Sequence, residues 1–196
     1  MSRQAERSEA TRAKLINAAR VLFTRRGYSA VGTEEIVKLA RVTRGALYHH
    51  FEDKRDLFRA VHERVEGELT ETIAAQLAAA GKQDPVEVLI GGVRTYLDAC
   101  ADPQVQRITL IDAPAVLGWG EWRRIEEKYG LGLVIAALEM GMEAGRLRRG
   151  PARPLAHVLL AGMGEAGMVI ANADDPGSAR EEVERALISI FDGLRA

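Results

Sequence analysis

The chain has 196 residues, 47% of them hydrophobic and 28% charged, which are the proportions of a soluble globular protein with a buried core. A single cysteine, Cys100, excludes an internal disulfide, and the polar start MSRQAERSEATRAK lacks the apolar run of a signal peptide, so we expect a cytoplasmic protein. The net charge of −1 conceals a split, because residues 1–59 carry 13 basic and 7 acidic side chains (+6) and the remainder carries −7.

This basic segment suits a polyanionic partner, although a chance distribution of solvated charges gives the same split. The first helix is predicted over about 9–26, where Leu15, Ala19, Leu22 and Phe23 recur at helical steps and Gly27 marks the end. Further helices are predicted over 33–40, 44–50, 54–80, 85–101, 103–112, 119–145, 154–173 and 178–194. Alternating strand patterns are absent, so the fold class is all-α, with about nine helices.

Some of the helix boundaries are marked by glycine and proline. Gly81 is expected to end the 54–80 helix, and Tyr129-Gly130 is a candidate break within 119–145. The apolar stretch 155–173 contains His157 and Glu165, and charge inside a membrane span is costly. We therefore interpret it as a buried helix and expect no membrane association.

Residues 33–51 have the pattern of a helix-turn-helix, with two short helices separated by "RVT". Thr33 and Thr43 are expected to cap the two helices. In this motif the second helix enters the major groove of DNA, with its N-terminal residues nearest the base edges. The sequence therefore predicts a DNA-binding unit.

The second helix carries the residues expected to contact DNA. Arg44 can donate two hydrogen bonds to guanine, and Gly45 allows the backbone to approach closely. Leu47 and Phe51 point the other way, into the core. Phosphate contacts are expected from Thr33, Thr43, Tyr48, His49, His50 and Lys54. Two alternatives stay open, namely Tyr48 as a half-buried core residue and Lys54 as a residue that simply caps or solvates the fourth helix.

Residues 15–61 resemble the DNA-binding domain of the TetR/AcrR family of bacterial transcriptional regulators. The matching residues are Ala18-Ala19, Leu22-Phe23, Gly27-Tyr28, Thr33, Ile36, Val42-Thr43, Gly45, Leu47-Tyr48, His50-Phe51, Lys54 and Leu57. The rest of the chain matches only in helix number and order. Arg41 is a departure, since the family often has glycine in this turn. A left-handed conformation there would cost arginine on the order of 1 kcal/mol.

The resemblance implies a homodimer whose N-terminal domains, here residues 1–53, bind an inverted-repeat operator in double-stranded DNA. It also implies that residues 54–196 form a helical domain that dimerises and binds a small-molecule effector which weakens DNA binding. Neither the effector nor the operator can be identified from the sequence, and an activator is an alternative to a repressor.

The ligand pocket is predicted around "IDAPAVLGWGEW", residues 111–122, where aromatic and polar side chains gather at a helix break. The candidate lining residues are Tyr96, Asp112, Trp119, Trp122, Tyr129 and Glu165. Core tryptophans and a helix-capping aspartate are the alternative explanation.

The last two helices are predicted to form the dimer interface, because one carries closely spaced small residues and the other an apolar stripe. The candidate residues are Leu160, Gly164, Gly167, Met168, Leu187, Ile190, Phe191 and Leu194. An intramolecular core is the alternative.

Motifs of enzymes are not found, so we predict no catalytic residues, no cofactor and no metal. Adjacent histidines on a helix point about 100° apart, so His49 and His50 do not make a chelating pair. Cys100 and His157 are interpreted as core residues. The rival hypothesis is an all-α enzyme or small-molecule-binding protein that retains the helix-turn-helix as a scaffold.

Overall fold

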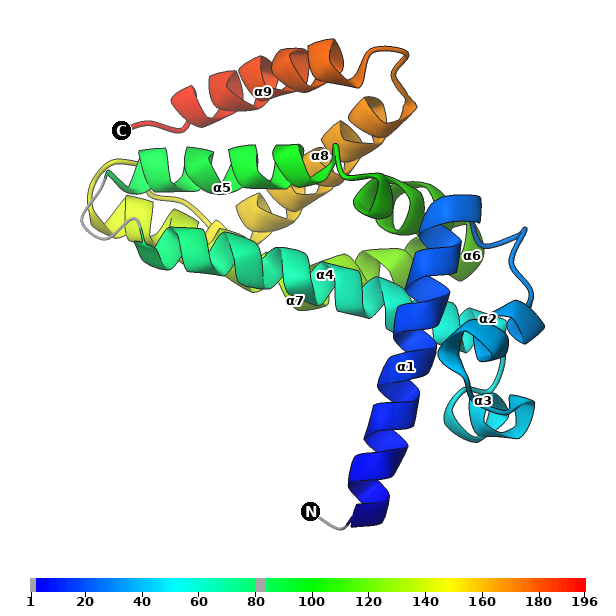
Figure 1. Ribbon diagram of the computed structural model, residues 1–196. Coiled ribbons are helices and arrows are strands. Elements are labelled where there is room, and N and C mark those ends of the chain that lie inside the picture. The colour runs from blue at the N-terminus through cyan, green and yellow to red at the C-terminus, as the bar shows by residue number, and fades with distance from the viewer. Residues whose placement is uncertain (1–2, 80–83) are drawn as a thin grey trace.

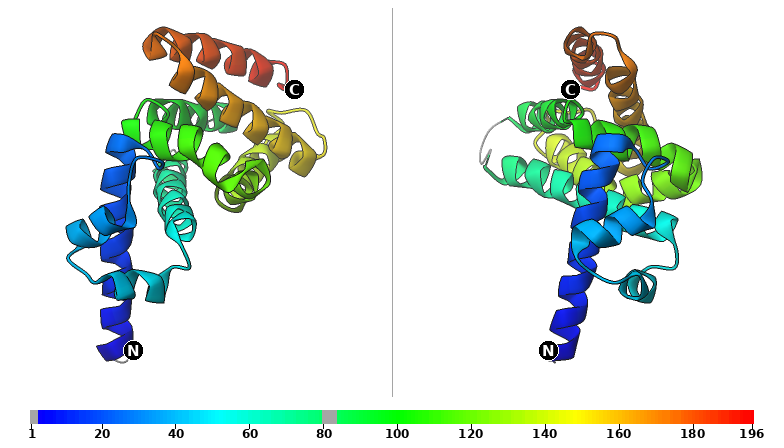
Figure 2. Two further views of the ribbon diagram at one scale, coloured as in Figure 1. Left: turned by 90° about the vertical axis from the view of Figure 1, so that its right-hand side faces the viewer. Right: turned by 45° about the vertical axis from the view of Figure 1, so that its right-hand side comes forward.

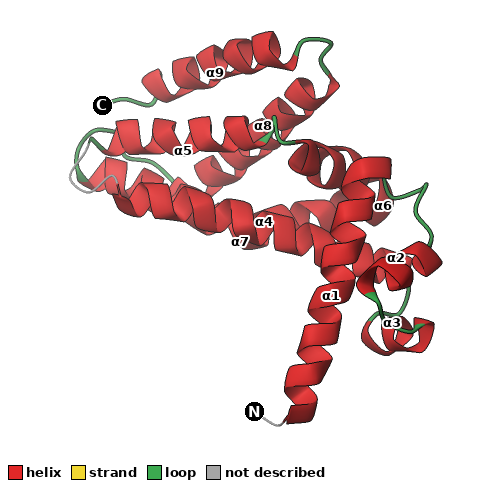
Figure 3. Ribbon diagram, in the orientation of Figure 1, coloured by secondary structure: helices red, strands yellow, loops and turns green. Residues whose placement is uncertain are grey.

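The computed structural model describes residues 3–79 and 84–196, and within these ranges the chain is all-helical, as predicted (Figure 3). The elements are α1 (Arg3–Arg26), α2 (Thr33–Ala40), α3 (Arg44–His50), α4 (Lys54–Ala79), α5 (Pro85–Ala99), a π-helical segment η1 (Val105–Asp112), α6 (Ala113–Leu117), α7 (Trp119–Glu143), α8 (Ala152–Asn172) and α9 (Pro176–Asp192). The predicted end of the fourth helix at Gly81 lies outside the described residues.

Helices α1, α2 and α3 form a small head at one end of the molecule (Figure 1). The N-terminal half of α1 extends past the other two helices, while its C-terminal half packs on them. Phe23, Ile36 and Leu47, one from each helix, are completely buried together. Gly27 ends α1 with a φ of 76°, a left-handed conformation that glycine adopts without strain. The predicted stop at Gly27 is therefore confirmed.

Helix α4 joins the head to the larger helical part of the chain (Figure 1). Its first two turns bury Leu57, Phe58 and Val61 in the core of the head, and the same core includes Val105 and Trp122 from η1 and α7. A second core lies between α5, α7, α8 and α9. Side chains from before and after the predicted domain boundary, between residues 53 and 54, therefore pack together in one core.

Two predicted features of the middle of the chain differ in the structure. The 103–112 helix has π-helical pitch, and the amide of Ala113 donates to the carbonyl of Ile108, five residues earlier. The predicted break at Tyr129-Gly130 is wrong, because α7 runs without interruption. Gly130 is instead a packing position, where an added Cβ would lie 3.1 Å from a methyl group of Leu160 in α8.

Helices α8 and α9 lie at the end of the molecule away from the head (Figure 2). By length and composition alone α8 could cross a membrane, which is weak evidence, and its inward side chains belong to the second core. Leu159, Met163 and Ile170 are among them. One side of α8 is therefore buried in the second core, whereas Val158 and Val169 on its other side are exposed, so the predicted burial holds for part of the helix only.

Candidate nucleic-acid interface and internal cavity

The connection between α2 and α3 is fixed by local caps. Gly32, rather than Thr33, precedes α2 as its N-cap, and the amide of Gly32 donates to Glu35 Oε1 at 3.3 Å. The predicted cap at Thr33 is wrong because this residue is already helical. The second predicted cap is confirmed, since Thr43 Oγ1 accepts from the amide of Ala46 at 3.2 Å. Arg41 has a φ of 55°, so the turn does use the left-handed conformation.

One side of α3 is buried and the other is open. Leu47 and Phe51 have 0% and 3% of their surfaces exposed, whereas Arg44, Gly45 and Tyr48 are exposed. A Cβ added at Gly45 would meet no atom closer than Thr43 Oγ1, at 3.9 Å. The fold itself therefore does not require glycine there, and the open position is available to an approaching molecule.

The polar side chains at the start of α3 contact one another. The guanidinium of Arg44 lies 5.6 Å from the centre of the Tyr48 ring and 3.9 Å from Glu34 Oε1. Hydrogen bonds from Thr33 and Arg44 lower the pKa of the Tyr48 phenol. Exposed ion pairs at such a distance contribute little to stability. Arg44 and Tyr48 are thus held loosely on the outer surface, next to Thr33.

The two histidines of α3 line a shallow groove with the N-terminal part of α1. His49 and His50 share this groove with Gly45, and Arg7 and Thr11 contribute from α1. The histidine ring centres are 5.2 Å apart. Within the described residues, no group of three or more His, Cys, Asp or Glu side chains is arranged to hold a metal ion. Arg7 is a basic residue of this surface that the sequence analysis did not single out.

Lys54 is directed into the head rather than outward. Its ammonium donates to the carbonyls of Tyr28 and Val31, each at 2.8 Å, and lies 4.0 Å from the centre of the Tyr28 ring. Partial burial lowers the pKa of this ammonium. Lys54 thus holds the connection between α1 and α2, which neither predicted role of this residue includes, and its phosphate contact stays a prediction.

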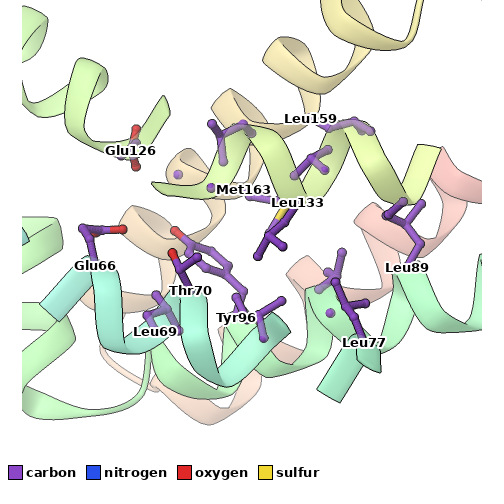
Figure 4. A pocket seen from close by; sticks show the side chains of 18 of the residues that line it. Glu66, Leu69, Thr70, Leu77, Leu89, Tyr96, Glu126, Leu133, Leu159 and Met163 are labelled. Atoms are coloured by element: carbon purple, nitrogen blue, oxygen red, sulfur yellow. The ribbon is translucent and has the colours of Figure 1, made fainter. Parts of the chain in front are cut away.

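A cavity lies inside the larger helical part, between α4, α5, α7 and α8 (Figure 4). Leucine, isoleucine, valine and methionine side chains make up most of its wall, and Leu77 and Leu133 are examples. Glu66, Thr70, Tyr96 and Glu126 supply polar atoms. The cavity volume is about 70 Å³, below the roughly 300 Å³ at the small end of typical ligand sites. A ligand of ordinary size therefore fits only if the surrounding helices or side chains move.

Of the residues predicted for the ligand pocket, Tyr96 lines this cavity and the others do not. Trp122 is 2% exposed in the core of the head, Trp119 is 66% exposed on the surface, and Glu165 is exposed on α8. Asp112 accepts a hydrogen bond from the amide of Tyr28, and Tyr129 packs against the core of the head. The predicted residues therefore gather around the helix break rather than between the long helices, and their contact with a ligand stays a prediction.

The sequence analysis missed Glu66 and Glu126, the two buried carboxyl groups of the cavity. Glu66 lies on the inward face of α4, one turn from His62, and the two side chains are 8% and 0% exposed. The sequence signal that could have identified Glu66 as buried is its position among apolar residues at helical spacing. However, Glu63 and Glu68 are close in sequence and give a similar local pattern, so the signal is weak.

The buried carboxyl groups have strongly shifted pKa values. Burial, assisted by the charge of Glu126, raises the pKa of Glu66 to about 8, and a hydrogen bond from Thr109 opposes this rise. Burial also raises the pKa of Glu126 to about 7, although Arg123 lies 3.0 Å away and opposes it. Burial lowers the pKa of His62 to about 4, so this imidazole is neutral at pH 7.

A polar junction connects η1 to the head. Asp112 Oδ2 accepts a hydrogen bond from the amide of Tyr28 at 2.7 Å, and Arg107 lies 3.4 Å from the same carboxylate. The guanidinium of Arg107 packs on Gly27 so closely that an added Cβ would be 1.9 Å from it. At the other side of η1, Thr109 Oγ1 lies 3.4 Å from His62 Nδ1. Segment η1 thus touches both the head and the neighbours of Glu66.

Most residues predicted for the dimer interface are buried within the chain. The buried ones are Leu160, Gly164, Gly167, Leu187 and Phe191, and Met168 and Leu194 are partly buried. These side chains belong to the second core, which was the alternative explanation. Ile190 is 51% exposed, and the same two helices also expose Val158 and Val169, at 68% and 46%. The outward apolar residues of α8 and α9 are therefore largely different from the predicted ones.

Comparison with known proteins bears on both parts of the chain. Residues 15–61 match the family described as bacterial regulatory proteins of the tetR family, and residues 86–194 match the tetracyclin repressor-like C-terminal domain. The second match alone covers more than half of the chain. The chain belongs to the TetR family.

Individual TetR-family proteins are similar over most of the chain. The TetC protein of transposon Tn10 from Escherichia coli is 30% identical over 74% of this chain and 72% of its own length. A TetR-family regulator from Pectobacterium atrosepticum is 30% identical, with a TM-score of 0.87 over 100% of this chain and 98% of its own. The regulator AcrR of Shigella flexneri is 38% identical, over 43% of this chain and 39% of its own. Proteins of this family are DNA-binding transcriptional regulators. That the exposed side of α3 reads the DNA stays a prediction from the helix-turn-helix pattern.

Proposed function

We propose that this chain is a cytoplasmic repressor that binds an inverted-repeat operator as a homodimer and is released when a small molecule occupies the cavity between α4, α5, α7 and α8. Arg44 and Gly45 would read base edges, while Tyr48, His49 and Thr43 would contact phosphates. The small molecule acts only through its different affinity for the two arrangements of the reading heads. No catalytic step is needed for this function.

The observation that carries this proposal is the path of α4. Its first turn holds the head through Lys54, and its later turns line the cavity with Glu66, Leu69 and Ile73. The cavity of about 70 Å³ is smaller than typical ligands require. Ligand entry therefore favours a displacement of α4, and the head moves with it.

The polar junction gives a second route from the cavity to the head. Thr109 contacts the surroundings of Glu66, and Asp112, three residues later on η1, holds the amide of Tyr28. A shift of η1 would therefore change the position of the α1–α2 connection. π-Helical segments often occur at functional sites, which agrees with a role of η1 in this coupling.

The dimer is proposed to form through the exposed sides of α8 and α9. Val158 and Val169 lie on one side of α8, together with exposed Ala161 and Gly162, and Ile190 lies on α9. Two such helices from each copy would make a self-complementary four-helix contact. This surface lies at the opposite end of the molecule from α3 (Figure 2), so dimerisation leaves both DNA-reading surfaces free.

The test is selection of DNA fragments by the purified protein at about 150 mM salt, where non-specific phosphate binding fades and specific binding persists. We expect enrichment of an inverted repeat. The selected DNA then becomes the probe for small molecules that lower affinity. Absence of an enriched sequence, from protein shown to be folded and dimeric, would contradict the proposal. Turnover of a bound small molecule would instead favour the enzyme hypothesis.

A further inference from the structure

The polar atoms of the cavity gather at one end of it. Figure 4 shows Glu66, Thr70, Tyr96 and Glu126 toward one side, and Leu77, Leu89 and Leu159 toward the other. The two carboxyl groups come from α4 and α7 and are only 8% and 7% exposed. A ligand in this cavity would thus meet hydrocarbon along most of its length and two carboxyl groups at one end.

The basic groups near these carboxyls do not balance them. Arg123 Nη1 lies 3.0 Å from Glu126, and Arg123 Nε lies 3.6 Å from Glu127, so one guanidinium serves two carboxylates. His157 contacts Glu127, at 3.3 Å. Among the described residues, Glu66 has no Lys, Arg or His within ion-pair distance.

The other groups around Glu66 are uncharged at neutral pH. Thr109 of η1 hydrogen-bonds to its carboxyl, and His62 of α4 is kept neutral by burial. Tyr96 of α5 and Cys100, the residue that follows this helix, keep their protons, because burial raises the pKa of both, that of Cys100 to about 12. The polar end of the cavity therefore holds two carboxyl groups, and Arg123, shared between Glu126 and Glu127, is the basic side chain that pairs with one of them.

This arrangement selects among ligand chemistries. A carboxylate or phosphate would be repelled by the ionised form of Glu66 or Glu126, and this repulsion is strongly unfavourable in a poorly solvated site. A pure hydrocarbon would leave the two carboxyl groups with no better partner than before. An ammonium group would supply the missing positive charge and donate charge-assisted hydrogen bonds.

We propose that the cavity binds an apolar molecule ending in a protonated amine, with the ammonium between Glu66 and Glu126 and the hydrocarbon among Leu77, Leu89 and Leu133. The inference rests on the proposed function, in that it specifies the effector of the same cavity. The ammonium holds Glu66 in its ionised form. Because Glu66 is mostly protonated at pH 7 in the free protein, amine binding at that pH releases a proton.

Three probes with one phenyl ring and different end groups test this proposal: phenethylamine, phenethyl alcohol and hydrocinnamate. Their binding to the full-length protein is measured by calorimetry at pH 7, in two buffers of different ionisation enthalpy. We expect the amine to bind at least about tenfold more tightly than the alcohol and the carboxylate to bind most weakly. The dependence of the binding enthalpy on buffer should reveal proton release with the amine alone.

Substitutions at Glu66 and Glu126 test whether these carboxyl groups bind the ammonium, and a third substitution serves as the control. Glu66→Gln should weaken amine binding by about tenfold or more and abolish the proton release, while alcohol binding changes much less. Glu71→Gln is the matched control, since it changes an exposed carboxylate of the same helix. Circular dichroism checks that the variants fold. Glu126→Gln, an independent change at the other carboxyl group, should also weaken amine binding.

Several results would overturn the ligand class. These are equal affinity for all three probes, tighter binding of the alcohol or the carboxylate, no binding of any probe, or unchanged amine binding by folded Glu66→Gln protein. Operator affinity measured with each probe separates this inference from the proposed function. Amine binding without loss of operator affinity would support the ligand class and contradict release. Release by the alcohol alone would support release and overturn the ligand class.

Discussion

Arg44 and Gly45 stand at the start of α3, where the fold makes little use of either residue. The Arg44 side chain is 66% exposed and its contact with Glu34 is 3.9 Å long. An added Cβ at Gly45 would find open surroundings. The core does not require these two residues. At the exposed start of α3 they are free to contact an external partner.

Arg44→Ala should therefore alter DNA reading without unfolding the head. We expect base preference to relax at one position in each half-site, with a cost of about 1–3 kcal/mol per contact. Sequencing of DNA selected by the variant measures this. Lys38→Ala, on exposed α2, is the control and should leave the preferred sequence unchanged. A uniform loss of affinity across all sequences would show that Arg44 only contacts phosphates.

Lys54→Ala should act on stability more than on DNA reading. Its ammonium donates to the carbonyls of Tyr28 and Val31, and both would lose this donor, although the Tyr28 carbonyl keeps the amide of Val31 at 3.3 Å. We expect the free energy of unfolding to fall by roughly 1–3 kcal/mol, measured by urea denaturation. Unchanged stability, together with a shallower salt dependence of DNA binding, would instead support the phosphate contact predicted for Lys54.

For the individual helices, the positions and the caps follow largely from the local sequence. Gly27 ends α1 and Thr43 caps α3 at the predicted positions, because a left-handed C-terminal residue and an N-cap depend only on neighbouring backbone groups. Periodicity also identifies inward faces correctly, as with Leu47 and Phe51. The helices and the exposed side of α3 could therefore be predicted.

The cavity and the outer apolar face could not be predicted in the same way. Periodicity shows that Leu160 and Phe191 face inward, but it does not distinguish a wall of the cavity from a subunit contact. Trp122 fills the core of the head because η1 and α6 bring the start of α7 against α4. Such positions depend on the packing of distant elements, which short-range patterns do not encode.

The π-helical segment η1 should carry part of the coupling between the cavity and DNA. Asp112→Ala removes the acceptor of the Tyr28 amide while leaving the cavity lining intact. We expect the effector to bind the DNA-free variant with nearly the same affinity as the unmodified protein. The effector should, however, change the operator affinity of the variant less than that of the unmodified protein, in which such coupling is typically about 5–150-fold. Operator titrations with and without effector measure this. Asp98→Ala on α5 serves as the control.

Undiminished coupling in folded Asp112→Ala protein would assign the transmission to α4 alone. It would also mean that the contact between η1 and the α1–α2 connection serves stability only.

The stability of the whole molecule should depend on pH through Glu66. Its pKa is raised from an ordinary value of 4.5 to about 8, so the folded state binds more protons than the unfolded state between these values. The contribution of Glu66 to stability should therefore fall as pH rises from 5 to 9, by on the order of 3 kcal/mol. The lowered pKa of His62 has the opposite effect below about pH 6.5, so the fall should be clearest above that pH. Glu66→Gln should flatten this dependence in urea denaturation curves. An equally steep fall in the variant would contradict the assignment.

The proposed dimer is tested by placing charge on the outer face of α8. Val169 is 46% exposed on the outer side of α8. Val169→Lys should convert the dimer to a monomer in sedimentation experiments, because an ammonium would be desolvated in the proposed contact. Leu39→Lys changes a leucine of similar exposure, 50%, on α2 in the head and should leave the dimer intact. A Val169→Lys dimer would place the contact on another surface.

The open surroundings of Gly45 have a genetic consequence. An alanine there leaves the core, the cavity and the α8–α9 surface unchanged, since the added Cβ meets nothing closer than 3.9 Å, yet it would hold the backbone away from the floor of the DNA groove. If two copies pair as proposed, a cell producing both forms would assemble mixed dimers with only one working head. One altered allele would thus disable normal subunits as well as its own product, and Gly45 is the position where a dominant-negative repressor would arise by a single substitution.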